Sequence, residues 1–156
     1  MLVDTREKKN SHITDYFTKH GIAYEPTTLS YGDYSFMLPS AAAGEDIFFH
    51  RDIAIERKGS LEELSGNLAQ ERERFEREFL KAGNDGAKLY LMVEDVGGYT
   101  SIISHKYNTQ LTSAAYMASL KAWEARFNCN VQFIDKQYSG YYIISTFRYF
   151  ARELLK

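Results

Sequence analysis

The sequence predicts an α/β protein with a central mixed β-sheet flanked by helices on both faces. Strand-like segments alternate with segments of helical periodicity, as in layered α/β folds. The run KLYLMVE at residues 88–94 is apolar almost throughout, which is typical of a central strand covered on both faces. The chain has 156 residues and neither a repeat nor a linker, so we expect a single domain over residues 1–156.

The elements expected in the first third of the chain are short. An amphipathic helix over residues 11–20 would bury Ile13 and Phe17 and end at Gly21. The other expected elements are, in order, a strand at the start of MLVDTRE, a strand that ends in a turn at Glu25-Pro26, a strand containing Gly32-Asp33, a hairpin connection at residues 38–46 and a β-rich segment at residues 47–56.

Helices dominate the rest of the chain. A long helix is expected to begin after Ser60, which forms an S-x-x-E capping box with Glu63, and to end near Lys81. The helix expected at residues 110–128 is apolar nearly all round, so it needs partners on more than one side. The remaining elements are a strand at residues 88–94, a loop at Gly97-Gly98, a strand at residues 130–134 and a helix at residues 139–155.

Composition excludes several classes of protein. Cys129 is the only cysteine, which excludes an internal disulfide and a cysteine-ligated zinc site. Charged residues interrupt the start of the chain and no apolar run has membrane-spanning length, so we expect an intracellular protein with no leader peptide and no membrane partner. The net charge of −2 argues against a general electrostatic grip on nucleic acid. Residues 1–82 hold 15 acidic and 11 basic residues, and this acidic part is where we expect a metal ion.

A charged triplet at the end of a strand is the strongest local signal. Ile53, Ala54 and Ile55 are followed directly by Glu56-Arg57-Lys58, and three charges at the end of a buried element are costly unless they are compensated. Strand alternation puts Glu56 and Lys58 on one face, with the backbone carbonyl of Arg57 between them. Asp33 lies 23 residues upstream on another strand, a separation that a hairpin can close.

This set of groups suits phosphodiester hydrolysis. Two carboxylates and a carbonyl are hard oxygen ligands for Mg²⁺, which keeps several waters and binds phosphate. Lys58 would hold the attacking water or steady charge on the phosphate. Each group also has an ordinary reading: E-x-K at a strand end is common, Asp33 follows a turn glycine, Glu62 and Glu63 suit a helix N-terminus, and Arg72 and Arg74 suit a solvated helix face.

The order of these motifs resembles that of the XPF/Hef-type structure-specific endonucleases. The family signature, GD followed by ERK-x-x-x-D, stands here as Gly32-Asp33 and Glu56-Arg57-Lys58 with Glu62 in the last position. The family's opening V-D-x-R-E stands as Val3-Asp4-Thr5-Arg6-Glu7, and its R-F-x-x-Q-like element as residues 74–78 with Glu78 in place of Gln. The strand ending in V-E is LYLMVE, and the resemblance covers nearly the whole chain.

The resemblance implies a restriction-endonuclease-like fold and assigns a role to each charged residue. Asp33, Glu56 and the Arg57 carbonyl are the expected ligands of Mg²⁺ or Mn²⁺, and Asp4 completes or backs the site. Lys58 positions the catalytic base. The expected phosphate-binding or bracing residues are Arg6, Arg57 and Arg74, and the expected supporting residues are Glu7 and Glu62. The Glu at position 62 has a longer arm than the family's Asp, which makes its role less defined.

The function implied is a metal-dependent endonuclease that cuts branched, flapped or junction DNA in repair or recombination. The alternatives are a catalytically weak module that binds a DNA junction or a partner, and a Holliday-junction resolvase of the same fold; a sequence-specific restriction nuclease ranks last.

No helix-hairpin-helix domain follows, so we expect a stand-alone form like those of phages and prophages, with DNA held by its own basic residues, a second subunit or a DNA-targeting protein partner. The family's nuclease domains pair through their last helices, and the last helix here has two aromatic faces, so we expect a homodimer. Those faces are Ile143, Phe147, Phe150 and Leu154 on one side and Tyr142 and Tyr149 on the other.

Overall fold

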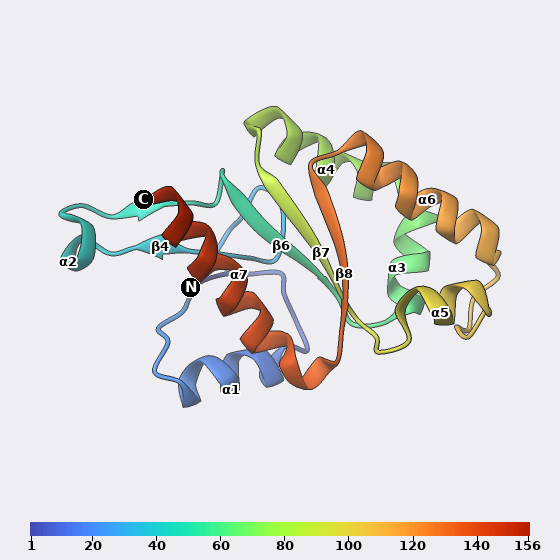
Figure 1. The fold of residues 1–156 in the computed structure, drawn as a ribbon, viewed down its shortest axis with the longest axis horizontal. Coiled ribbons are helices and arrows are strands. Elements are labelled where there is room, and N and C mark those ends of the chain that lie inside the picture. The colour runs from blue at the N-terminus through green and yellow to red at the C-terminus, as the bar shows by residue number, and fades with distance from the viewer.

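The structure, a computed structural model, describes residues 1–156 as one six-stranded mixed sheet between two groups of helices (Figure 1). The strand order is β2-β1-β3-β6-β7-β8. The strands are β1 (Leu2–Asp4), β2 (Glu25–Thr27), β3 (Tyr34–Ser35), β6 (Ile53–Lys58), β7 (Lys88–Glu94) and β8 (Cys129–Ile134). β3 is antiparallel to both of its neighbours, β1 and β6. The pairs β1–β2, β6–β7 and β7–β8 are parallel. The predicted mixed α/β sheet is confirmed.

Helices cover both faces of the sheet. One face carries α1 (Ser11–Lys19) and α7 (Ser139–Leu154). The other face carries α3 (Leu61–Leu68), α4 (Arg72–Asp85), α5 (Gly98–Ile103) and α6 (Ser113–Arg126). The expected helices at residues 11–20, 110–128 and 139–155 are therefore confirmed to within three residues at each end. None of these helices combines the length and the apolar character needed to cross a bilayer.

Strand β6 shows how the sequence pattern builds both layers. Ile53 and Ile55 belong to the core under α1 and α7, whereas Ala54 belongs to the core under α3, α4 and α6. Since side chains alternate along a strand, Glu56 and Lys58 lie on the Ala54 face and Arg57 lies on the Ile55 face. The strand therefore delivers its charged end to both sides of the sheet at once.

The single long helix expected from Ser60 to Lys81 is wrong, because the chain turns at residues 69–71 and forms α3 and α4. Both segments have the same helical spacing of apolar residues, so periodicity alone does not reveal the break. Arg72 closes the first helix by donating from Nη1 to the Leu68 carbonyl at 3.1 Å. The capping box is present in part: the Glu63 N–H donates to Ser60 Oγ, but the Glu63 carboxylate accepts from Gly59.

The chain between β1 and β6 also departs from expectation. Residues Glu25 and Pro26, expected in a turn, belong to β2, where the edge position tolerates a proline. The expected hairpin connection is present, with β4 (Met37–Leu38) paired to β5 (Ile47–Phe48) around the short α2 (Ser40–Ala43). The segment 47–56 thus divides into β5 and β6. Of the loop expected at Gly97-Gly98, Gly97 precedes α5 as its N-cap and Gly98 is the first residue of α5.

Candidate active site

One polar cavity of about 560 Å³ lies where β6 and β7 end. Phe75 of α4 is its only hydrophobic lining residue. Acidic and basic side chains line it in equal number, which suits a charged ligand. The acidic residues are Glu7, Asp33, Glu56, Glu63, Glu71, Glu78 and Glu94, and the basic residues are Arg6, Lys8, Lys9, Arg57, Lys58, Arg74 and Lys136.

The structure brings Asp33 and Glu56 to the same place. Tyr34 of β3 pairs with Ile55 of β6, so the antiparallel register sets Asp33 beside Glu56. The Asp33 N–H donates to the Ile55 carbonyl at 2.8 Å, and its Oδ2 accepts from the Arg57 N–H at 2.7 Å. Burial raises the pKa of Asp33 well above its ordinary value, and the charges of Glu56 and Glu7 raise it further. A cation between the two carboxylates would relieve this repulsion.

Lys58 lies beside Glu56 as strand alternation predicts. Its Nζ is 2.9 Å from Glu56 Oε1 and 3.9 Å from Glu63 Oε1, and it lies 5.1 Å from the centre of the Phe75 ring. Burial lowers the pKa of Lys58, but Glu56 and Asp33 outweigh this and keep its pKa above the ordinary value. Lys58 therefore remains a cation, which suits it to holding a water or a phosphate oxygen.

Arg57 points to the other face of the sheet and braces carboxylates there. Its guanidinium binds Glu7 through Nε at 2.8 Å and Nη2 at 3.0 Å, and it binds Glu94 through Nη1 at 2.6 Å. Nη2 also donates to the Lys8 carbonyl at 2.8 Å. The side chain is 8% exposed. Of the two roles expected for Arg57, these contacts support the bracing of carboxylates.

Glu94 is a site residue to which the sequence assigned no role. Besides Arg57, it accepts hydrogen bonds from Ser139 Oγ at 2.6 Å and contacts His12 Nε2 at 2.5 Å. These partners stand at the first residue of α7 and in the first turn of α1. The parallel register of β6 and β7 could have predicted that the two strand ends meet, but His12 and Ser139 carry no sequence signal for this contact.

Asp4 is not brought to the metal position. Its buried carboxylate accepts from the Arg6 N–H, Nε and Nη2 and from the Leu29 N–H, at 2.8 to 3.1 Å, and it does not line the cavity. Burial alone would raise its pKa, but these hydrogen bonds lower the pKa below the ordinary value. Asp4 holds Arg6, whose side chain does line the cavity.

The acidic residue that α3 contributes to the cavity is Glu63, whereas Glu62 points elsewhere. The Glu62 carboxylate accepts from the Asn108 N–H at 2.9 Å and does not line the cavity. Glu63 was expected only as part of a helix cap. Arg74 does line the cavity, is 73% exposed and pairs only with Glu71, so it is free to reach a ligand.

The donor set fits a divalent cation that keeps some of its waters. No group of three or more His, Cys, Asp or Glu side chains is arranged to hold a metal alone. Asp33 Oδ1 accepts no hydrogen bond from the protein, since the Arg57 N–H binds Oδ2, and Glu56 uses Oε1 for Lys58. Two such carboxylates with the Arg57 carbonyl and solvent match the oxygen-rich, partly hydrated sites of Mg²⁺ and Mn²⁺.

The fold and the position of this cavity define a class of protein. A mixed sheet covered by helices on both faces, with a cavity lined by charged residues at the ends of its strands, is the architecture of restriction-endonuclease-type nucleases. The structure is similar to that of XPF from Aeropyrum pernix, with a TM-score of 0.61 and 19% sequence identity. The similarity covers 95% of this chain and 64% of that one, so the chain corresponds to less than two thirds of that protein.

The chain belongs to the ERCC4 domain family, which it matches over residues 3–146. This is the family of XPF-type nucleases, so the resemblance expected from the GD and ERK motifs is confirmed. A comparison with curated proteins finds no match.

Proposed function

We propose that this protein is a Mg²⁺- or Mn²⁺-dependent endonuclease that hydrolyses phosphodiester bonds in branched or flapped DNA during repair or recombination. The observation that carries the proposal is the convergence of Asp33, Glu56 and Lys58 on one polar cavity at the end of β6. Membership of the XPF-type nuclease family supports the reaction class.

Asp33, Glu56 and the Arg57 carbonyl would hold the metal, which supplies a polarised phosphoryl oxygen and a more acidic bound water. Lys58 orients the water or balances charge on the phosphate, since it remains protonated. Arg6 and Arg74 meet the scissile and flanking phosphates from the cavity wall. Arg57 fixes the Asp33 carboxylate through its N–H. In-line attack by water on phosphorus would break the P–O3′ bond, so that the 3′-oxygen leaves as a hydroxyl and the phosphate stays on the 5′ end.

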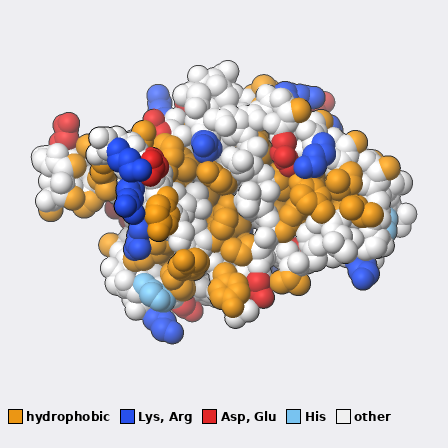
Figure 2. All heavy atoms as spheres, viewed as in Figure 1, with side chains coloured by type: hydrophobic (Ala, Val, Ile, Leu, Met, Phe, Trp, Pro, Cys, Tyr) orange, Lys and Arg blue, Asp and Glu red, His pale blue; other side chains and the backbone are white.

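We further propose that two copies pair through α7. Figure 2 shows hydrophobic side chains in a band over α7, with Lys and Arg beside its C-terminal end. Ile143 and Phe147 fill the core, and Tyr142, which was expected on the partner face, also packs against it. The exposed rings of α7 are those of Tyr141 and Tyr149, at 61% and 57%. An apolar helix face of this kind favours a symmetric contact with a second copy. A dimer would present two cavities to the arms of a branched DNA, and a DNA-targeting partner could add to this grip.

The experiment that tests the activity uses end-labelled flap, fork, four-way and linear duplex DNA with Mg²⁺, Mn²⁺ or EDTA. We expect metal-dependent cutting near the branch of flaps and forks, and little cutting of linear duplex. Preferred cutting of four-way DNA would instead identify a Holliday-junction resolvase.

Matched variants separate the site from its surroundings. Glu56→Gln and Lys58→Ala should each lower the cleavage rate by at least about a hundredfold, the ordinary cost of losing one catalytic interaction. Glu25→Gln and Lys19→Ala change exposed residues of the same types away from the cavity and should leave the rate unchanged. Cutting that survives both cavity substitutions would contradict the proposal. Tight binding without cutting by the unaltered protein would identify a binding module.

A further inference from the structure

A second, shallower hollow of about 380 Å³ adjoins the cavity. It is lined by Arg6, Leu29, Ser30, Tyr31, Arg51, Lys81, Asn84 and Asp85. Its single acid, Asp85, accepts a hydrogen bond from the Tyr31 hydroxyl at 2.9 Å. Three cations against one acid make this hollow positive, although the chain as a whole carries a net charge of −2.

Two features join the hollow to the catalytic cavity. Arg6 lines both. Helix α4 also lines both, because Phe75 and Glu78 face the cavity while Lys81 and Asp85 face the hollow. These positions recur at intervals of three or four residues, which places them on one face of the helix. The two depressions thus form one groove with α4 as a common wall.

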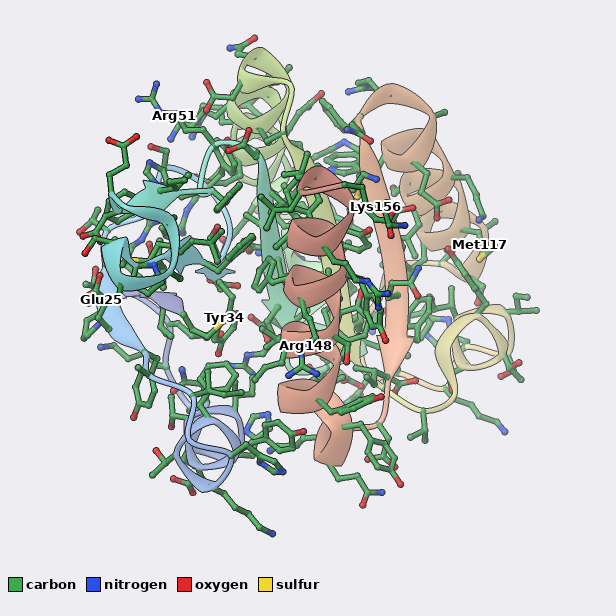
Figure 3. The ribbon with its side chains drawn as sticks, turned by 60° about the vertical axis from the view of Figure 1, so that its left-hand side comes forward. Glu25, Tyr34, Arg51, Met117, Arg148 and Lys156 are labelled. Atoms are coloured by element: carbon green, nitrogen blue, oxygen red, sulfur yellow. The ribbon has the colours of Figure 1, made fainter.

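The cations of the hollow are free to bind an anion. Arg51 is exposed and takes part in no ion pair, and Figure 3 shows it directed outward. Lys81 is 56% exposed and has only Glu78 within reach, at 3.7 Å. Arg6 is 60% exposed; Asp4 and the Leu29 carbonyl hold its Nε and Nη2, which leaves Nη1 unbonded. An arginine held in this way binds phosphate with little further loss of freedom.

We propose that this hollow binds a backbone phosphate of the DNA strand whose scissile phosphate lies in the cavity, an assignment that rests on the proposed function. From Phe75 to Asp85, α4 rises about 15 Å at 1.5 Å per residue. Phosphates of one strand of a duplex are spaced about 3.4 Å apart along the axis. The groove is therefore longer than the spacing between neighbouring phosphates, and Arg51 and Lys81 meet a phosphate a few positions from the cut.

The test replaces single phosphates of a flap substrate by neutral methylphosphonates near the cleavage site. Binding is measured in the Glu56→Gln background, so that the DNA stays intact. In protein with no other substitution, a methylphosphonate at one linkage a few positions from the cut should weaken DNA binding by about fivefold, the upper range for one exposed ion contact. With Arg51→Ala and Lys81→Ala added, a methylphosphonate at the same position should no longer affect binding. On unmodified DNA, these two substitutions should lower the magnitude of the slope of log affinity against log salt concentration by about 1.

Cleavage provides the second readout. With Glu56 intact, the Arg51→Ala and Lys81→Ala pair should raise KM by about fivefold and leave kcat unchanged, because the hollow contacts the strand away from the reacting atoms. Lys19→Ala is the control: it removes an exposed cation from α1, which lines neither the cavity nor the hollow, and should change neither value.

The outcomes separate this inference from the proposed function. If the unaltered protein cuts DNA while every methylphosphonate acts equally on it and on the double variant, the subsite is refuted and the nuclease stands. If no metal supports cutting, the nuclease proposal fails, and the binding scan still decides the subsite. If inorganic phosphate binds in the hollow but no methylphosphonate changes DNA binding, the hollow is a site for a free anion and the proposed contact with the DNA strand is wrong.

Discussion

Arg57 stands between the two cavity residues of β6, and its side chain acts on the opposite face of the sheet. Its N–H holds Asp33 at 2.7 Å while its guanidinium holds Glu7 and Glu94. The arginine thus neutralises two carboxylates that are 8% and 0% exposed. This is the compensation that a charged triplet at the end of a buried strand requires.

Replacing Arg57 should be costly to stability as well as to activity. Arg57→Ala leaves Glu7 and Glu94 buried without their cation, and the free energy of unfolding should fall by about 3–5 kcal/mol. Urea denaturation of the purified variant measures this loss. Arg74→Ala is the control: the Arg74 side chain is 73% exposed, and its ion pair with Glu71 should contribute less than about 1 kcal/mol to the free energy of unfolding. Equal losses for the two variants would contradict the bracing role.

Asp4 should contribute stability that depends on pH. Its pKa in the folded state is lowered below the ordinary 3.8, so its contribution is complete above pH 3.8 and is lost as the pH falls through the folded pKa. Asp4→Asn should lower the free energy of unfolding by about 1–3 kcal/mol at pH 7, the usual value of hydrogen bonds to a charged group. The difference in the free energy of unfolding between the parent protein and Asp4→Asn should become smaller below pH 3.8. Denaturation series at several pH values measure this difference. A gap that stays constant would contradict the lowered pKa.

Sequence reasoning reached the cavity residues that lie on a strand or directly before one; the strand expected to contain Gly32-Asp33 begins only at Tyr34. Alternation along β6 predicts that Glu56 and Lys58 share a face, and the GD motif predicts Asp33 near them. It failed for Asp4, the last residue of β1, and for Glu62, in the first turn of α3, because a carboxylate at the end of an element can rotate toward several partners. Local backbone groups, the Leu29 N–H and the Asn108 N–H, decide those two orientations, and neither is visible in a motif.

At the scale of elements, the contact between β3 and β6 sets the distance between Asp33 and Glu56, the two proposed metal ligands. Gly32 precedes Asp33 with a φ of +74°, and a Cβ there would lie 2.7 Å from the Ala54 Cβ. Position 32 of the GD motif therefore requires glycine for two physical reasons: its backbone is left-handed, and the neighbouring strand approaches it closely. Both place Asp33 against Arg57.

Gly32→Ala should separate β3 from β6. The added methyl forces a strained backbone and a shift of Ala54, with an expected loss of about 2 kcal/mol and a lower cleavage rate as Asp33 moves. Gly83→Ala provides the contrast, since nothing lies within 4 Å of the added Cβ and alanine favours α4 by up to about 1 kcal/mol. Thermal unfolding of both variants measures the difference, and a Gly32→Ala protein as stable as the parent would refute the close approach.

Elements with a strong hydrophobic period were predictable, and those defined by tertiary pairing were not. The central strand at residues 88–94 and the last helix match their predictions closely. The break between α3 and α4 escapes prediction because it keeps both apolar faces in one core. β2 has only three residues and a proline, so its identity comes from pairing with β1 rather than from its own composition.

For the whole molecule, the unequal use of the two sheet faces predicts how copies associate. On one side of the sheet α3 and α4 line the cavity, whereas on the other side α7 leaves the rings of Tyr141 and Tyr149 exposed. A charge at Tyr149, as in Tyr149→Asp, should therefore abolish dimerisation. Sedimentation over a concentration series measures this, with Tyr24→Asp, at a residue that is 41% exposed, as the control that stays dimeric. A monomeric parent protein would refute the pairing.

The hydrogen bond from Ser139 to Glu94 has a consequence for the timing of activity. Glu94 binds Arg57, the Arg57 N–H binds Asp33, and Ser139 is the first residue of α7. The chain must therefore fold through the start of α7 before this series of contacts is complete. A product truncated before Ser139 lacks one end of the series, and we expect it to hold Asp33 less firmly even when its sheet is formed.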